Sequence, residues 1–372
     1  MHLYIHIPFC KQACHYCDFH FSTNLNQKSA LVEAIGLEIQ IQRDYLPTRH
    51  LETIYLGGGT PSLLTEAELA HLFGVIHEQF TVSPDAEITL EANPDDLTPD
   101  KLPLLRQYAN RLSIGLQTFD EATLRWMNRA HTAAEAEQCV QLAREAQFDN
   151  LSVDLIYGVA GGIWSNDLAR VLALDVPHVS AYALTIEPDT AFGRWTKTGK
   201  LPPLDENLAA DHFEELVAAL RGAGYEHYEI SNFAKPGQYA RHNTAYWQQR
   251  PYLGVGPSAH SYNGHSRQFN VANNAQYLNV IRQGRLPAEV EILTPADRVN
   301  EYLLTGLRTQ WGCSLSQLDT LSGASFVEQQ AAELIDLQQR GWLTHQNNQL
   351  QLTEQGKLFA DRVAASLFVE LV

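Results

Sequence analysis

Cysteines are scarce and unevenly spread in this sequence. There are 5 Cys among 372 residues, and three of them lie between positions 10 and 17. A secreted domain held by disulfides would carry more cysteines along its length, so we expect a reducing compartment and a metal-binding cluster. Cys139 and Cys313 stand apart from the other three, and we interpret both as buried core thiols.

Positive charge and long apolar runs are also lacking. With 26 Lys+Arg against 43 Asp+Glu, the formal net charge is −17. Such a charge repels phosphate backbones, so we expect no nucleic-acid partner. No stretch reaches the roughly 18 uncharged apolar residues of a membrane span, and the start "MHLYIHIPFC" lacks the basic stretch of a targeting segment. We therefore expect a cytoplasmic protein without a membrane span.

Strand-like runs and helical patterns alternate over the first two hundred residues. The strand-like runs begin near residues 2, 51, 86, 111, 150 and 178, and segments such as "TEAELAHLFGVIHEQF" lie between them. This alternation predicts a parallel α/β sheet with helices outside it. Six units fit a partial barrel or an open doubly wound sheet, and the pattern does not separate the two.

The rest of the chain divides into two further parts. We predict an α/β unit over residues 1–232, an irregular, aromatic-rich connecting segment over 233–294, and a C-terminal domain over 295–372. The connecting segment includes "RHNTAYWQQRPYLGVGPSAHSY", whose Gly, Pro and Asn residues favour irregular structure over a site.

The C-terminal domain shows helix and hairpin signals. "TPADRVNEYLLTGLRT" predicts a helix with Thr294 as its cap and Pro295 at its first position. A second helix is predicted in "EQQAAELIDLQQRG", a hairpin turning at Asn347 and Asn348 follows, and "EQGKLFADRVAASLF" predicts a closing helix. Helix, helix and hairpin in this order are typical of a winged helix.

Residues suited to chemistry gather where the predicted strands end. In α/β barrels the active site lies at the carboxyl ends of the strands. The cysteine loop follows the first strand and the glycine-rich "GGGTP" follows the second. Glu91 and Gln117 end the third and fourth strands, Asp154 lies in the fifth, and Arg129 follows the fourth. "GGGTP" lacks the Gly-Lys-Ser/Thr of a P-loop, but its glycines allow close backbone approach to a ligand.

The three clustered cysteines predict a metal centre. A cubane iron–sulfur cluster has four irons, and Cys10, Cys14 and Cys17 would leave one of them open to a small chelating molecule. The alternative is a zinc site that adds His15 or His20 as a fourth ligand. Coincidental burial is the remaining interpretation, and three thiols in one short loop argue against it.

These motifs carry a family resemblance. "YIHIPFCKQACHYC" is similar to the CxxxCxxC signature of radical S-adenosylmethionine (SAM) proteins. Together with "GGGTPS", "LEANP", "LSIGLQTF" and "VDLIYG", it resembles the oxygen-independent coproporphyrinogen III oxidase family over nearly the whole chain. The resemblance implies a partial (β/α)6 TIM-like barrel with a mainly helical, winged-helix-like C-terminal domain.

The resemblance also implies the cofactors and their contacts. Cys10, Cys14 and Cys17 would bind a [4Fe–4S] cluster whose open iron takes SAM, and one electron from the cluster would cleave SAM to methionine and a 5′-deoxyadenosyl radical. The positions that match contacts of this SAM are Tyr4, Gly58 and Glu91. The positions that match a second SAM of the oxidase are Tyr16, Gly59, Thr60, Gln117, Arg129 and Asp154.

Two departures from the oxidase pattern and one further motif resemble the HemW-type haem chaperones of this family. Phe19 stands where the oxidase has a further cysteine, only a short segment precedes Cys10, and a His-Asn-x-x-Tyr-Trp motif begins at His242. This resemblance implies a protein that binds haem and passes it to apo-proteins, including membrane respiratory enzymes, and a homodimer is compatible with it. The alternative is an active enzyme: the oxidase, a methyltransferase or a haem-processing relative.

The resemblance makes His242 the expected haem ligand, because a neutral imidazole is a common axial ligand of haem iron. Tyr246 and Trp247 would pack on the porphyrin faces. A structural role for His242, with His260 or His265 as the ligand instead, is the alternative interpretation.

Overall fold

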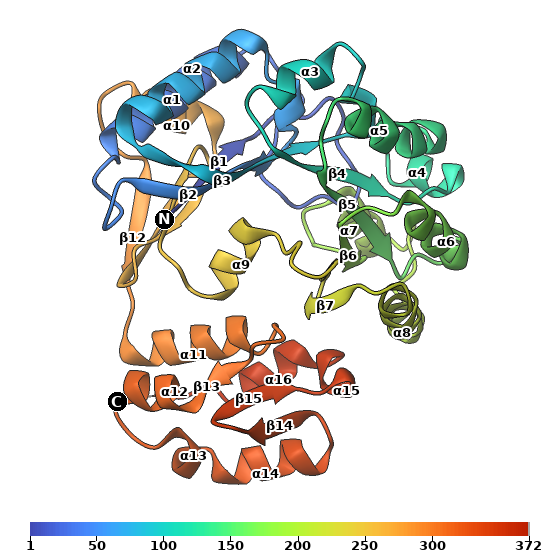
Figure 1. Ribbon diagram of the computed structural model, residues 1–372, viewed down its shortest axis with the longest axis vertical. Coiled ribbons are helices and arrows are strands. Elements are labelled where there is room, and N and C mark those ends of the chain that lie inside the picture. The colour runs from blue at the N-terminus through green and yellow to red at the C-terminus, as the bar shows by residue number, and fades with distance from the viewer. Residues whose placement is uncertain (371–372) are drawn as a thin grey trace.

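The computed structural model describes residues 1–370 of the chain, and a twelve-stranded sheet forms its centre (Figure 1). The strands are ordered β12-β11-β10-β9-β1-β2-β3-β4-β5-β6-β8-β7. The six central strands are parallel to their neighbours in this set, which confirms the predicted parallel sheet. These strands are β1 (His2–Ile7), β2 (His50–Gly58), β3 (Thr81–Ala92), β4 (Arg111–Gln117), β5 (Asn150–Tyr157) and β6 (His178–Ala183).

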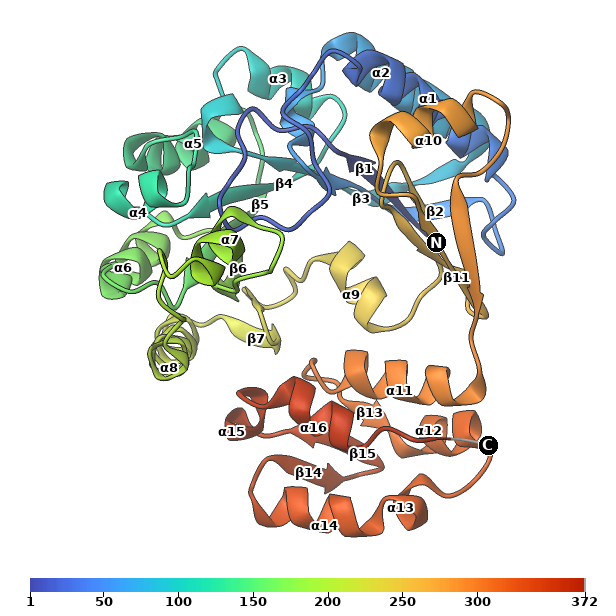
Figure 2. The same ribbon diagram turned by 180° about the vertical axis from the view of Figure 1, so that it is seen from behind.

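Helices cover the outer face of the curved sheet, as Figures 1 and 2 show, and this arrangement confirms the partial barrel. Leu3, Ile5 and Ile7 of β1 are fully buried, as expected for a parallel strand covered by helices. Capping boxes at Thr65 and Thr132 fix where two of these helices begin. The helices of the barrel are α1 (Lys28–Ile41), α2 (Glu66–Gln79), α3 (Lys101–Arg106), α4 (Glu121–Trp126), α5 (Ala133–Glu145), α6 (Trp164–Leu174), α7 (Ala191–Lys197) and α8 (Glu206–Gly222), with single turns at Pro61–Leu63 and Pro94–Asp96.

The segment predicted to be irregular, 233–294, is instead part of the sheet. Its strand β9 pairs in parallel with β1 and extends the barrel, and its apolar residues share the barrel's core. Gly254 is needed in β9, because a Cβ there would lie 1.9 Å from the carbonyl oxygen of His260. The sequence prediction was therefore wrong, because glycines that signal loops here permit close strand packing. Elements from β7 to β12 are β7 (Glu226–Glu229), β8 (Asn232–Ala234), α9 (Arg241–Trp247), β9 (Tyr252–Val255), β10 (His260–Tyr262), β11 (Ser266–Asn270), α10 (Asn274–Ile281) and β12 (Ala288–Ile292).

The C-terminal domain has its own hydrophobic core and a three-stranded sheet in the order β13-β15-β14. A capping box at Thr294 starts α11. Asn347 and Asn348 both adopt positive φ in the hairpin turn, as the two central residues of a type I′ turn must. The predicted closing helix is broken into two, and α12 was not predicted. The elements are α11 (Pro295–Gly306), β13 (Cys313–Ser314), α12 (Leu315–Ser322), α13 (Phe326–Gln329), α14 (Ala331–Gln339), β14 (Leu343–Gln346), β15 (Gln349–Leu352), α15 (Glu354–Lys357) and α16 (Ala360–Ser366). Residues 371–372 of the predicted domain lie outside the described residues.

Two further features of the chain concern burial and length. Cys139 and Cys313 are 1% and 0% exposed, which confirms that both are core thiols. Within residues 1–370, no helix combines the length and the apolar character needed to cross a membrane.

Candidate functional site

The cysteine loop follows β1 and is anchored to the neighbouring strand end by main-chain hydrogen bonds. The amide of Gly59 donates to the carbonyl of Ile7 at 3.0 Å, and the amide of Thr60 donates to that of Phe9 at 2.7 Å. A Cβ on Gly59 would come within 2.8 Å of the main chain of Ile7 and Phe9, so only glycine allows this approach. The glycine-rich turn thus holds the loop, and with it Cys10, Cys14 and Cys17, at the carboxyl ends of the strands.

The three clustered thiols are partly buried, and burial raises the pKa values of two of them. Burial raises the pKa of Cys10 to about 11 and that of Cys17 to about 12. Cys14 accepts a hydrogen bond at 3.4 Å from the guanidinium of Arg129, which places a positive charge beside this sulfur. Because thiolates are the ligands of iron–sulfur clusters, iron binding must release protons here. Three thiols in one anchored loop, next to a cation, fit a cluster.

The histidines of the zinc alternative are engaged elsewhere. A ring nitrogen of His15 bonds to the carbonyl of Trp126 at 2.8 Å, and a ring nitrogen of His20 bonds to the side chain of Asn274 at 2.7 Å. In the described part of the chain, no three His, Cys, Asp or Glu side chains converge on one position suited to a single metal ion. One ring nitrogen of each histidine is therefore already engaged, and zinc could reach that nitrogen only after the hydrogen bond breaks.

Glu91 lies at the end of β3 and is held by the neighbouring strand β2. Its two carboxylate oxygens accept hydrogen bonds from the hydroxyl of Tyr55 at 2.7 Å and from the amide of Gly58 at 3.1 Å. A Cβ on Gly57 would lie 2.7 Å from the Tyr55 ring and 2.9 Å from the Glu91 carboxylate. Glycine at position 57 therefore leaves the room in which the tyrosine and the carboxylate meet.

Two carboxyl groups of the site have raised pKa values. Burial raises the pKa of Glu91 to about 7, although the hydrogen bond from Tyr55 opposes this effect. Burial likewise raises the pKa of Asp154 to about 6, and the charge of Arg111 opposes it. Asp154 accepts a long hydrogen bond, 3.4 Å, from Ser113 on the neighbouring strand. Acids whose pKa values are shifted by burial and by specific neighbours are typical of functional sites.

Arg129 connects the cysteine loop to the ends of β3 and β4. Its guanidinium donates to the side chain of Asn93 and to the carbonyl of Gly115, both at 2.7 Å, and to the hydroxyl of Tyr16 at 3.4 Å. Its Nε is buried and has no hydrogen-bond partner among residues 1–370. An unpartnered donor in a polar site suits a ligand acceptor at this place.

The remaining predicted site residues surround the same arginine. Asn93 donates to the hydroxyl of Thr60 at 3.2 Å, so the glycine-rich turn belongs to the network. Gln117 adopts a φ of 68° beside a register irregularity between β4 and β5. Such a backbone at a non-glycine residue is costly and concentrates at functional sites. A Cβ on Gly115 would lie 2.9 Å from the Gln117 amide and 3.3 Å from the Arg129 guanidinium, so these two side chains meet beside Gly115.

Tyr4 and His242 lie on the inner side of the barrel near Tyr55. The Tyr4 ring is 6.0 Å from that of Tyr55, and its hydroxyl bonds to a ring nitrogen of His6 at 3.1 Å. His242 is 1% exposed, and its imidazole lies 5.1 Å from the Tyr55 ring. The predicted haem ligand is therefore buried close to the predicted SAM residues.

Sequence reasoning missed Tyr55 and Asn93 as parts of the site. Tyr55 lies in the interior of a strand, where an aromatic residue is usually part of the core. Asn93 follows Glu91 by two residues at the end of β3, and a polar side chain at a strand end was the signal that could have identified it.

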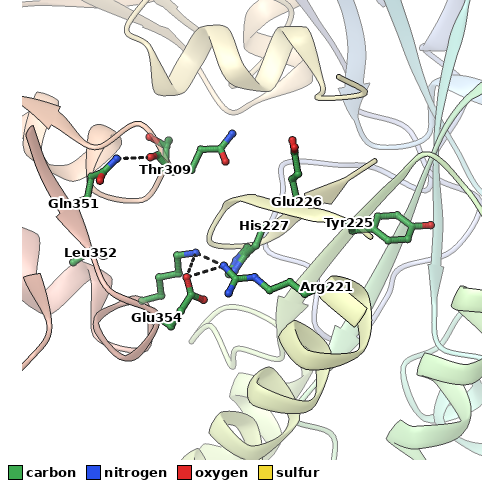
Figure 3. Close-up of a pocket in the computed structure, with 10 residues that line it drawn as sticks. Arg221, Tyr225, Glu226, His227, Thr309, Gln351, Leu352 and Glu354 are labelled. Carbon is green, nitrogen blue, oxygen red and sulfur yellow. Dashed lines mark hydrogen bonds and ion pairs between the residues drawn. The ribbon is translucent and has the colours of Figure 1, made fainter. Parts of the chain in front are cut away.

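A second, polar cleft of about 400 Å3 separates the barrel from the C-terminal domain (Figure 3). Arg221 of α8 and Lys357 of α15 both donate to one carboxylate oxygen of Glu354, at 2.7 and 3.1 Å. Lys357 also donates at 3.2 Å to His227, whose other ring nitrogen bonds to the carbonyl of Ile230. These contacts join the two domains across the cleft, away from the cysteines.

Comparison with known proteins finds relatives over the whole chain. Residues 4–165 match the Radical SAM superfamily and residues 293–359 match the HemN C-terminal domain. "Heme chaperone HemW" of Bacillus subtilis is 34% identical, with 99% of each chain covered. "Heme chaperone HemW" of Escherichia coli is 32% identical, with 99% of this chain and 98% of the relative covered. The solved structure of coproporphyrinogen III oxidase (HemN) from Escherichia coli, a radical SAM enzyme, superposes with a TM-score of 0.85 and 26% identity, covering 99% of this chain and 90% of that one.

Proposed function

The chain belongs to the HemW family of radical SAM proteins, and from this premise we propose that it is a haem chaperone. In this function the protein binds haem and transfers it to acceptor apo-proteins. The observation that carries the proposal is the match over 99% of both chains to a relative named as a heme chaperone. Phe19, which stands where the oxidase has a cysteine, is 69% exposed, and it supports a chaperone over an oxidase.

Membership of the radical SAM superfamily implies a [4Fe–4S] cluster and SAM. The cluster, when bound, supplies one electron to SAM. We assign the cluster to Cys10, Cys14 and Cys17. Tyr4, Gly58 and Glu91 would bind and orient the amino-acid part of SAM, with Glu91 held in place by its two hydrogen bonds.

A second group of residues would complete the SAM-binding region. Around the Arg129 guanidinium, donors and acceptors suited to an adenosyl or carboxylate group come together. The residues proposed for this role are Tyr16, Gly59, Thr60, Gln117, Arg129 and Asp154. The number of SAM molecules bound per chain tests whether these residues hold a second SAM, as in the oxidase.

We propose His242 as the iron ligand of the haem. Its two ring nitrogens bond to the hydroxyls of Thr53 at 2.6 Å and Tyr246 at 2.8 Å. Burial holds the pKa of His242 well below its usual value, so the imidazole is neutral, as an axial ligand must be. Iron ligation requires one of the two hydroxyls to move away first.

The proposed acceptors are haem-dependent apo-proteins, membrane respiratory enzymes among them, and the proposed location is the cytoplasm. A homodimer is the proposed assembly. These proposals follow from the family, and co-purification of the haem-loaded protein with an acceptor tests the first of them.

Binding of SAM should depend on pH through Glu91. Because the pKa of Glu91 is raised to about 7, the carboxyl is mostly protonated below that pH and lacks the negative charge that binds the amino group of SAM. We expect the Kd for SAM to fall about tenfold from pH 6 to pH 8, as a single ionisation near pH 7 requires. Isothermal titration calorimetry on reconstituted protein measures the change.

Glu91→Gln is the matched variant, because it keeps the shape and one acceptor. Its SAM affinity should be weaker and should vary less with pH. An equal pH dependence in wild type and Glu91→Gln would assign the ionisation to another group.

Haem titration locates the ligand. In wild type we expect a Soret shift that saturates, and in His242→Ala a weaker shift, because the axial imidazole is lost. His260→Ala and His265→Ala test the two exposed alternatives, and His345→Ala, in the C-terminal hairpin, is the control.

The outcomes of the haem titration test the choice of His242 and the chaperone function separately. An unchanged His242→Ala titration contradicts only the choice of His242. A wild-type protein without saturable haem binding contradicts the chaperone function itself.

A further inference from the structure

Tyr55 touches both of the sites proposed above. Its hydroxyl donates to Glu91 at 2.7 Å, and its ring lies 5.1 Å from the imidazole of His242 at an angle of 33°. Burial, together with the charge of Glu91, raises the pKa of Tyr55 well above its usual value, so the hydroxyl stays protonated and remains a donor. One rigid aromatic side chain therefore supports a carboxylate on one side and a histidine on the other.

The two strands that carry Glu91 also hold the segment around His242. Along β2, Thr53 bonds to the His242 ring two residues before Tyr55. Along β3, Glu87 lies four residues before Glu91 and accepts the amides of Arg241 and His242 at 3.1 and 3.0 Å. Each strand thus carries residues that contact α9 and residues of the Glu91 site.

In its present packing, α9 contains buried polar atoms that have no hydrogen-bond partner. Thr244 Oγ1 and Trp247 Nε1 are buried in this helix without a hydrogen-bond partner among residues 1–370. A buried polar atom without a partner loses its hydrogen bonds to water and gains none in return, so each of them destabilises the present packing. Figures 1 and 2 show α9 on the inner side of the sheet, between it and α11. This helix is therefore the element of the inner face least satisfied by its present packing.

Haem ligation at His242 and the present position of Tyr55 compete. An iron atom can reach Nε2 of His242 only after the hydroxyl of Tyr246, one turn further along α9, leaves it. An imidazole that turns towards the iron would lose its present contact with the Tyr55 ring. On the side of the Tyr55 ring that faces Glu91 there is no free space, because the Tyr55 and Glu91 side chains already lie against Gly57.

We propose that Tyr55 is a positioning residue that couples SAM binding and haem binding with opposite sign. The arrangement that holds Glu91 ready for SAM is the one in which both ring nitrogens of His242 are hydrogen-bonded to Thr53 and Tyr246. Saturating SAM therefore weakens haem binding, and haem weakens SAM binding by the same factor, because linkage between two ligands is reciprocal. The inference rests on the proposed function and adds its regulation: SAM favours release of the haem.

The test is a haem titration of anaerobically reconstituted protein at zero and at saturating SAM. Difference absorbance against the same protein without haem removes the contribution of the cluster. We expect the haem Kd to rise at least about fivefold with SAM, the lower end of usual coupling between sites. Calorimetric titration of SAM with and without haem should give the same factor.

Tyr55→Phe keeps the ring against His242 and removes the hydroxyl that holds Glu91. In this variant the factor by which SAM changes the haem Kd should fall towards one. Tyr225→Phe is the matched control, because it removes a buried tyrosine hydroxyl that donates to Val176 away from the site. This control should keep the full factor.

Two results would decide against the inference. A haem Kd in wild type that is unchanged or lowered by SAM overturns it, and so does a full factor in a folded Tyr55→Phe protein. Should Tyr55→Phe fail to fold, the wild-type haem Kd with and without SAM remains the test, because a Kd that SAM does not raise still overturns the coupling. Absence of saturable haem binding in wild type is a different outcome, because it contradicts the proposed function on which the inference rests.

Discussion

Cys14→Ala should abolish the iron–sulfur cluster. Wild-type protein reconstituted without oxygen should hold about four irons and four sulfides, as a single cubane cluster requires. Cys14 lies in the centre of the anchored loop beside Arg129, and two remaining thiols cannot hold the cluster there. Iron and sulfide analysis, with the visible spectrum, measures the loss.

Cys139→Ala is the matched control. Cys139 is also buried, but it lies in α5 within the barrel core. This variant should keep its iron and lose only stability, because it leaves a small cavity. A Cys14→Ala protein that keeps four irons, or a colourless wild type that binds one zinc per chain, would contradict the assignment.

Gly59→Ala should remove the cluster while leaving all three cysteines in place. The added Cβ would meet the main chain of Ile7 and Phe9 at 2.6–2.7 Å, and main chain cannot swing aside. Overpacking of this kind costs about 1–3 kcal/mol, which corresponds to roughly 5- to 150-fold in the equilibrium for docking of the cysteine loop. Iron content after reconstitution and the rate of cluster loss in air are the measurements.

Gly74→Ala controls for the substitution itself. Gly74 lies in α2, and a Cβ there meets nothing within 4 Å. Replacing glycine by alanine inside a helix should stabilise the protein by about 0.5–1 kcal/mol. Equal iron content in the Gly59→Ala and Gly74→Ala proteins would show that the loop does not depend on this close approach.

The barrel could be predicted because its signals are local and repeated. Five of the six predicted strands begin within a residue of those observed, since buried parallel strands appear as apolar runs between helices. The exception is β3, which begins at Thr81, five residues before the predicted start. The first part of β3 contains Pro84 and Asp85, and the sequence did not indicate a strand there because neither residue type favours strands.

The segment after β8 could not be predicted because its strands depend on distant partners. β9 is four residues long and contains Gly254, yet it pairs with β1 from the start of the chain. A strand this short shows no hydrophobic periodicity in the sequence. It is a strand because it pairs with the free edge of β1. The sequence indicated loops where glycine allows tight packing.

The candidate site was predictable in part. The cysteines, the glycine-rich turn and Glu91 have unusual spacing or positions, and the structure gathers them at the strand ends. The role of Tyr55 is a matter of tertiary contact, because its partners Glu91 and His242 lie 36 and 187 residues away in the chain. His242, the proposed haem ligand, is enclosed by the hydroxyls of Thr53 and Tyr246, which its position in the sequence did not indicate.

We propose that this chain carries haem and does not convert coproporphyrinogen III. The most direct measurement is a haem titration run beside a coproporphyrinogen III assay on one reduced, reconstituted sample. We predict saturable haem binding and no formation of protoporphyrinogen IX. Product formed at a catalytic rate, without saturable haem binding, would contradict the account.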